Sequence, residues 1–223
     1  MRYLFDENAG EKSLQIEGES YRYLFKSRRH KVLDTIYMRN LRDDFLYGYR
    51  VESVSKRYAV LSLVEKKELA IKPQKYLHIG WCVVDTKTVE KTLPMLNEMG
   101  VSKISFVYCD RSQKNFKIDF LRLKKILINS SQQCGRSVLM DLEVLGDIKE
   151  YFEKYPKSAV LDFGGEVLEN DKIEEILIGC EGGFSEKERN FFQNRPIYRV
   201  DTPMVLKSES AVVGVSAICL LKL

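Results

Sequence analysis

Two residue types that support metal and nucleophilic chemistry are scarce in this chain. Its 223 residues include two histidines, His30 and His78, and five cysteines, of which no two form a CxxC pair. We therefore expect no metal site and no disulfide framework, and we predict that the cysteines are reduced and mostly buried. They are Cys82, Cys109, Cys134, Cys180 and Cys219.

Long hydrophobic segments are also absent. The longest uncharged apolar stretch, residues 211–221, is shorter than the roughly 20 residues that a membrane-spanning helix needs. The first residues, MRYLFDENAG, turn acidic at once and lack the apolar segment of a secretion signal. We expect a soluble, cytoplasmic protein that does not enter a membrane.

Several well-known catalytic and phosphate-binding motifs do not occur. The sequence contains no GxxxxGK[ST], no GxGxxG and no GxSxG, so it supports neither a nucleoside triphosphatase, nor a Rossmann dehydrogenase, nor an α/β-hydrolase. A Ser-His-Asp triad is hard to build because both histidines lie in or near the first third of the chain.

The small net charge of +4 is unevenly placed. Residues 1–72 hold 15 basic and 11 acidic side chains, whereas residues 73–223 hold 21 of each. Residues 21–42 carry seven basic side chains and four aromatic rings against one acid, Asp34. Basic groups neutralise phosphates and aromatic rings stack on bases, so this segment is a candidate nucleic-acid contact. A solvated basic face whose aromatics lie in the core is the alternative.

Hydrophobic periodicity divides the chain into a β-rich first part and an alternating second part. Residues 45–51 and 58–64 have the composition of strands, and Pro73 follows a charged stretch, so we place a domain boundary at 72–75. Further strands are predicted at 76–84, 103–108, 138–144, 159–163, 176–178 and 197–200. Helices are predicted at 89–99, 120–133, 148–155, from 185 and at 209–221. Gly100 ends the first of these helices, and Pro94 must kink or split it.

This alternation favours a parallel sheet covered by helices on both faces. Ligands of such sheets bind beyond the carboxyl ends of the strands, where three loops stand out: DFGG at 162–165, GCEGGFS at 179–185 and DTPMVLKSESA at 201–211. Glycines let the backbone approach a ligand, and the helix that begins at Ser185, with a capping box to Glu188, suits an anionic group. Any one loop could be a plain turn, but three at successive strand ends predict a pocket.

These segments resemble a known family. ILIGCEGGFSEKE at 176–188 is similar to the LIGPEGGFS-x-x-E signature of the small-subunit ribosomal RNA uridine-N3 methyltransferases (RsmE type), and VLKSESAVVGVSAI at 205–218 resembles their LRxETA segment. DRS at 110–112 resembles the family's E-R-S/C, QCGR at 133–136 its E-Q-C/S-x-R, and EMGV at 98–101 its E-L-G-V. Arg29 resembles the arginine of its VLR motif. The matches run in order over nearly the whole chain.

The resemblance implies a fold and an activity. Residues 1–72 would form a PUA-like β-barrel that binds RNA, and residues 73–223 a SPOUT methyltransferase domain, an α/β fold whose parallel sheet carries a deep trefoil knot. S-adenosylmethionine would lie bent within the knot. The family members are homodimers whose active site forms at the subunit interface. Their substrate is 16S ribosomal RNA or the small ribosomal subunit, and their product is a uridine methylated at N3.

The resemblance also implies roles for individual residues. Cofactor binding falls to the three loops, at Asp162, Gly164, Gly179, Glu181, Gly182, Gly183, Val205, Leu206 and Ser208. RNA contacts fall to Lys26, Arg28, Arg29, Arg111 and Lys207. Uridine N3–H is a weak acid that needs a proton acceptor, so Glu209 is the candidate base and Arg136 a second catalytic candidate. For Glu209 a helix cap is the alternative role, for Arg136 and Arg111 an interface ion pair, and Glu181 is expected to organise its loop.

Four positions depart from the family pattern. Cys180 replaces a proline and Lys207 an arginine, whereas Met204 and Met95 replace basic residues. The cofactor loops are thus better preserved than the basic positions around them. Two other functions stay open: a SPOUT methyltransferase that acts on a ribose 2′-OH or on tRNA, and a non-catalytic RNA-binding protein.

Overall fold

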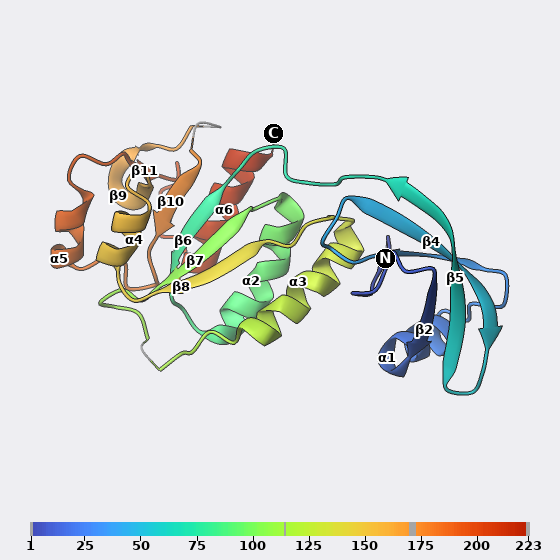
Figure 1. Ribbon diagram of the computed structural model, residues 1–223. Helices are drawn as coiled ribbons and strands as arrows, with labels where there is room; N and C mark the ends of the chain where they lie inside the picture. The colour runs from blue at the N-terminus through green and yellow to red at the C-terminus, as the bar shows by residue number, and fades with distance from the viewer. Residues whose placement is uncertain (1, 114, 170–172, 222–223) are drawn as a thin grey trace. The chain divides into compact units, whose positions relative to one another are not determined.

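The computed structural model describes residues 2–113, 115–169 and 173–221, whose contacts divide the chain into two compact units (Figure 1). One unit consists of Met1–Lys72 with Ile128–Leu139, and the other of Pro73–Leu127 with Met140–Leu223. The segment Ile128–Leu139 thus belongs to the same unit as residues 1–72, although residues 73–127 of the other unit lie between them in the sequence. Its Gln132 Oε1 accepts the Phe5 amide at 2.7 Å.

A five-stranded sheet in the order β1-β3-β4-β5-β2 forms the N-terminal unit. Its strands are β1 (Leu4–Phe5), β2 (Ser13–Glu17), β3 (Thr35–Arg39), β4 (Phe45–Val54) and β5 (Tyr58–Glu68). β1 pairs parallel with β3, and the other pairs are antiparallel. The strands predicted at 45–51 and 58–64 are confirmed as β4 and β5. Both are longer than predicted, because their exposed polar ends pair in the hairpin and carry no hydrophobic signal.

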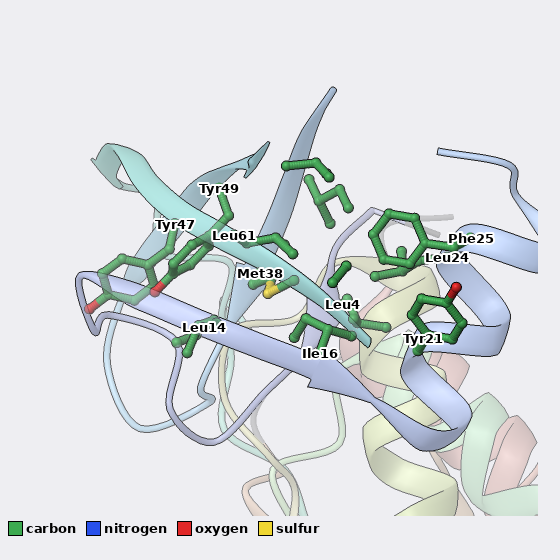
Figure 2. Packing of buried hydrophobic residues seen from close by; sticks show 14 residues of the cluster. Leu4, Leu14, Ile16, Tyr21, Leu24, Phe25, Met38, Tyr47, Tyr49 and Leu61 are labelled. Atoms are coloured by element: carbon green, nitrogen blue, oxygen red, sulfur yellow. The ribbon is translucent and has the colours of Figure 1, made fainter. Parts of the chain in front are cut away.

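A short helical segment packs on this sheet (Figure 2). It consists of α1 (Gly18–Tyr21) and a π-helix, η1 (Arg22–Ser27). Tyr21 and Phe25 project into the core cluster that includes Met38, whereas Lys26 and Arg28 are exposed. Tyr21 and Phe25 are buried and six of the seven cations of residues 21–42 are exposed, as the alternative of a solvated basic face describes. Arg39 is the exception, because it is buried and donates to the Phe45 and Leu69 carbonyls.

Six strands in the order β11-β9-β10-β6-β7-β8 form the sheet of the C-terminal unit, and every pair is parallel. The strands are β6 (His78–Cys82), β7 (Lys103–Val107), β8 (Asp141–Leu145), β9 (Ala159–Val167), β10 (Glu175–Ile178) and β11 (Ile197–Arg199). The helices are α2 (Thr86–Met99), α3 (Phe120–Cys134), α4 (Ile148–Lys154), α5 (Glu186–Arg189), a 3-10 turn η2 (Asn190–Phe192) and α6 (Ser208–Leu220). The residues of α3 from Ile128 on belong to the N-terminal unit. The predicted parallel sheet with alternating helices is confirmed.

Adjacent residues of β6 show that helices cover both faces of this sheet. A Cβ on Gly80 would lie 2.6 Å from the ring of Tyr151 in α4, so glycine is needed for that helix to pack. The next side chain, Trp81, donates its indole N–H to Ser208 of α6 at 2.9 Å. Successive strand residues point to opposite faces, so α4 and α6 lie on opposite sides.

Local signals in the sequence explain the bounds of α2. The Asp85 side chain accepts the Thr88 amide at 3.0 Å and caps the first turn. Gly100 ends the helix with a left-handed φ of 99°, as predicted. Pro94 lies inside the helix, which continues from Thr86 to Met99 without being split.

A buried polar chain crosses β6, β7 and β8. The ring Nε2 of His78 lies 2.6 Å from Ser105 Oγ, and that hydroxyl donates to Glu143, which also pairs with Lys103 and Lys154. Because the Ser105 proton goes to Glu143, His78 donates through Nε2–H, and its buried Nδ1 has no hydrogen-bond partner among the described residues. Burial, followed by the Lys103 charge, lowers the pKa of His78 to about 4.

The expectation that all cysteines are reduced is wrong for two of them. Cys82 and Cys109 form a disulfide with their Cα atoms 5.9 Å apart. Cys82 ends β6 opposite Val107 of β7, so Cys109 lies at the same end of the neighbouring strand. Parallel pairing brings together residues 27 positions apart, which spacing alone does not reveal. Cys134, Cys180 and Cys219 form no disulfide within the part of the chain that the structure describes.

Candidate functional site

One pocket of about 370 Å³ lies beside the middle of β9 and the ends of β10 and β11, and all three segments singled out in the sequence line it. From β9 come Leu161, Asp162 and Phe163. From β10 and the glycine loop, defined as residues 179–184, come Ile178, Gly179, Cys180, Gly183 and Phe184. From β11 to α6 come Arg199, Val200, Thr202, Met204, Leu206, Ser208 and Ala211. The predicted convergence of the three segments on one pocket is therefore confirmed.

The first of these segments is not a loop, which corrects the prediction for residues 162–165. β9 continues to Val167 because its polar end pairs with Tyr198 and Arg199 of β11, after a register shift. Gly165 is required there: a Cβ would lie 2.5 Å from the Ile197 backbone. The irregular pairing turns Asp162 and Phe163 toward the pocket wall.

Asp162 supplies the pocket wall with a carboxylate that is held in place. Arg189 of α5 donates to both of its oxygens, at 2.8 and 3.2 Å, and also to the Phe184 carbonyl at 3.1 Å. The paired carboxylate raises the pKa of Arg189, so this cation stays charged. The bidentate ion pair ties the glycine loop to β9.

A tight turn shapes the glycine loop. The Gly183 amide donates to the Cys180 carbonyl at 2.9 Å, and Gly183 has a left-handed φ of 64°, which favours glycine. Burial raises the pKa of the Cys180 thiol, which therefore stays neutral. Cys180, in place of the family's proline, directs its thiol toward the Gly183 carbonyl at 3.8 Å.

The capping box predicted after this loop is confirmed, but the anion site suggested with it is not. Ser185 Oγ accepts the Glu188 amide at 3.2 Å, and Glu188 accepts the Ser185 amide at 2.7 Å. The helix α5 that follows has only four residues. Because the box uses both amides, these two donors are not available to an anionic ligand.

Ser208 links the last helix to the loops around it. Its buried hydroxyl accepts the indole N–H of Trp81 at 2.9 Å and donates to the Gly179 carbonyl at 2.6 Å. The only hydroxyl proton is therefore used within the protein. Ser208 lines the pocket but acts first as a connection between β6, the glycine loop and α6.

The rim of the pocket is apolar and open. Phe163 and Met204 line the pocket with 69% and 71% of their surface exposed, and Val205 beside them is 78% exposed. Met204 stands where the resembling family has a basic residue, so it adds no positive charge. Arg199 lines the same pocket and pairs with Asp201 at 3.2 Å.

The predicted cofactor residues fall into two groups. Asp162, Gly179, Gly183, Leu206 and Ser208 line the pocket. Gly164, Glu181, Gly182 and Val205 lie on the same segments, outside the lining and, for these four, exposed. Sequence reasoning missed the apolar lining residues, such as Phe163, Phe184 and Ala211, although each lies next to or within a quoted motif.

The catalytic candidates lie in different units. Glu209 is half-buried in the first turn of α6, directly after Ser208, and the exposed Lys207 stands at the N-cap position without a side-chain capping hydrogen bond. Arg136 belongs to the N-terminal unit, where it is buried and donates through Nε to the Val138 carbonyl at 2.8 Å. Its own carbonyl accepts the Tyr3 hydroxyl at 2.6 Å.

The candidate RNA contacts also separate. Lys26, Arg28 and Arg29 are exposed in the N-terminal unit, and Arg29 has a left-handed φ of 61°. Arg28 lies over the Tyr23 ring, 5.4 Å from its centroid, and donates to the Tyr23 hydroxyl. Arg111 belongs to the C-terminal unit and donates to the Gly182 carbonyl at 2.6 Å.

The described residues hold neither a metal-binding cluster nor a membrane-spanning helix. Among the described residues, no group of three or more His, Cys, Asp or Glu side chains is arranged to hold a metal ion. Within the same part of the chain, no helix combines the length and hydrophobicity of a membrane span.

Comparisons with known proteins point to one family. Residues 72–220 match the family model described as an RNA methyltransferase domain. The chain is 49% identical over 223 residues to "Ribosomal RNA small subunit methyltransferase E" of Helicobacter pylori strain J99, which covers 98% of this chain and 99% of that protein.

Solved structures share the fold. A probable rRNA-methyltransferase from Porphyromonas gingivalis matches with a TM-score of 0.83 at 18% identity, over 98% of this chain and 95% of that one. A ribosomal RNA small subunit methyltransferase E from Neisseria gonorrhoeae, bound to S-adenosyl methionine, matches with a TM-score of 0.81 at 16% identity, over 97% and 95%. The chain therefore belongs to the RNA methyltransferase family, and within it to the small-subunit ribosomal RNA methyltransferase E group.

Proposed function

We propose that this protein is an S-adenosylmethionine-dependent methyltransferase that methylates N3 of a uridine in 16S ribosomal RNA, in the cytoplasm. The convergence of the three motif segments on one pocket carries this proposal. The relative from Helicobacter pylori, named for small-subunit ribosomal RNA, supports the substrate class. The N3 position rests on the motif resemblance.

The residues of the pocket fit the cofactor chemically. S-adenosylmethionine supplies an electrophilic methyl group on a positively charged sulfonium, next to an apolar purine. The Asp162 carboxylate gives the wall a negative charge, and Leu161, Ile178 and Leu206 give it apolar surface. Apart from its two chain neighbours, no described residue has an atom within 4 Å of a Cβ placed on Gly183, so that glycine leaves room beside its backbone.

The protein's own residues then have separable tasks. Asp162, fixed by Arg189, presents its charge without moving, which lowers the cost of ordering the site. Glu209, placed by the first turn of α6, is the proposed acceptor of the N3 proton. Lys26, Arg28 and Arg29 are the proposed contacts to RNA phosphates.

Three finer features belong to the same proposal. The N-terminal unit is a PUA-like RNA-binding domain, the C-terminal unit carries a trefoil knot, and the active enzyme is a homodimer. The strand order β11-β9-β10-β6-β7-β8, with α6 returning to β6 through Ser208 and Trp81, supports the knotted SPOUT topology. The exposed apolar rim at Phe163 and Met204 supports burial against a second copy.

Nucleoside mass spectrometry of small-subunit ribosomal RNA tests the proposal. We expect cells lacking the protein to lose one 3-methyluridine, which purified protein and S-adenosylmethionine restore in vitro. Protein without the cofactor is the control. Unchanged 3-methyluridine in the deleted strain would reject the ribosomal assignment. Methylation at a ribose or of tRNA would assign the other SPOUT reaction, and no methyl transfer would leave a binding protein.

A further inference from the structure

The glycine loop needs support from outside, because three of its six residues are glycines. Gly179, Gly182 and Gly183 restrict the backbone little, so a defined shape costs more conformational entropy here than elsewhere. Its internal turn joins only Cys180 and Gly183. The pocket therefore depends on contacts made from neighbouring segments.

Arg111, in the loop after β7, supplies such a contact. Its Nη1 donates to the Gly182 carbonyl at 2.6 Å. The aliphatic part of the side chain lies on Gly182 itself, since a Cβ there would approach Arg111 Cβ at 3.2 Å and Cδ at 3.3 Å. Gly182 is thus a glycine because Arg111 packs on it, whereas Gly183 is a glycine because of its φ.

The backbone that carries Arg111 is fixed by a buried carboxylate. Glu188, 6% exposed, accepts the Asp110 amide at 2.8 Å through Oε1 and the Ser185 amide at 2.7 Å through Oε2. Ser185 Oγ donates back to Asp110 Oδ2 at 2.6 Å and closes the ring. Asp110 and Ser185, 75 positions apart, are thereby held together where the glycine loop ends.

The other side of Arg111 is fixed as well. Cys109 is bonded to Cys82 at the end of β6, and the Ser112 hydroxyl accepts the Cys109 amide at 3.1 Å. Neither Arg111 nor Glu188 lines the pocket. Any effect of these side chains on a ligand must therefore pass through the glycine loop.

We propose that Arg111, held by Asp110, Ser185 and Glu188, is a positioning residue that keeps the glycine loop in the shape that binds S-adenosylmethionine, and that it is not an RNA contact. This inference rests on the proposed use of the pocket. It reassigns Arg111, which the motif resemblance placed against RNA, because its guanidinium is already engaged by Gly182.

Two variants of Arg111 and one control variant separate the contribution of its hydrogen-bond donor from that of its aliphatic packing. Arg111→Met keeps the aliphatic packing and loses the donor, whereas Arg111→Lys keeps a donor on a long side chain. Arg122→Met removes another exposed cation, which pairs with Glu90 and does not line the pocket, and is the matched control. If the loop is correctly shaped only one tenth of the time without its donor, the dissociation constant rises about tenfold.

Calorimetry with S-adenosylmethionine and no RNA is the first measurement. We expect Arg111→Met to raise the dissociation constant about tenfold, Arg111→Lys to restore part of the loss, and Arg122→Met to match the native protein. RNA affinity measured without cofactor should be the same for Arg111→Met and Arg122→Met. Weaker RNA binding by Arg111→Met with unchanged cofactor affinity would make Arg111 an RNA contact and overturn the inference.

Hydrogen exchange over residues 179–185 keeps the test independent of the ligand. Arg111→Met and Glu188→Gln should both speed exchange in this segment. In Glu188→Gln one of the two oxygens that accept the Asp110 and Ser185 amides becomes an NH2 group, which cannot accept a backbone N–H. If the native protein fails to bind S-adenosylmethionine, the proposed function is refuted. Faster exchange in the two variants would still support the positioning of the glycine loop by Arg111. Unchanged exchange in both variants would refute positioning whatever the ligand.

Discussion

Ser208 allows the cost of a buried, unpaired donor to be measured inside the candidate site. Ser208→Ala removes the acceptor of the Trp81 indole N–H, and Trp81 is fully buried. Leaving such a donor without a partner costs about 1–3 kcal/mol. The Gly179 carbonyl also loses its donor but borders the open pocket, where water replaces it. We therefore expect Ser208→Ala to lower the free energy of unfolding by about 2 kcal/mol.

The Trp81→Phe background tests this reasoning. Phenylalanine has no N–H, so Ser208→Ala leaves no orphaned donor there and should cost under about 1 kcal/mol. Urea unfolding of the four proteins, followed by far-UV circular dichroism because Trp81 is the single tryptophan, gives the two costs. Equal costs in both backgrounds would show that the Trp81–Ser208 hydrogen bond contributes nothing of its own.

Three further outcomes are expected. Gly182→Val places a branched side chain against Arg111 and should abolish S-adenosylmethionine binding; unchanged affinity in calorimetry would contradict this. Arg29→Ala should weaken RNA binding in filter assays and leave cofactor affinity intact, whereas equal loss of both would contradict the separate tasks of the two units. The pKa of His78 is about 4 folded and about 6.5 unfolded, so the unfolded state binds the extra proton, and stability should fall by about 3 kcal/mol as pH drops from 6.5 to 4. His78→Gln can still donate to Ser105, and its denaturant midpoint should change little between pH 6.5 and pH 4. If the midpoint of this variant falls as much as that of the native protein, other groups cause the pH dependence.

Regular elements of the C-terminal unit could be predicted because their signals are local. The glycine stop at Gly100 and the capping box at Ser185 each depend on residues within one turn. The end of β9 was missed because its polar residues are ordered by pairing with β11, which periodicity does not record. β1 has only two residues, and β2 and β3 have five each, so their alternation of buried and exposed residues is too short to stand out in the sequence.

For the site, the motifs predicted which segments meet and not how each side chain is used. Residues of all three motif segments line the pocket. The double hydrogen bond of Ser208, the ion pair between Asp162 and Arg189, and the disulfide of Cys82 all join residues distant in sequence. Such contacts depend on the order of the strands in the sheet, which cannot be predicted from composition or from the spacing of residues.

The discontinuous N-terminal unit has a consequence for how this chain can be cut or recombined. A fragment ending at Lys72 would leave the Tyr3 hydroxyl, the Phe5 amide and the Ile71 amide without the partners they find between residues 132 and 137. The unit is therefore not a portable module that gene fusion can move by its first 72 residues. To transplant it onto another enzyme, an engineer would have to bring along the end of α3 as a second insertion.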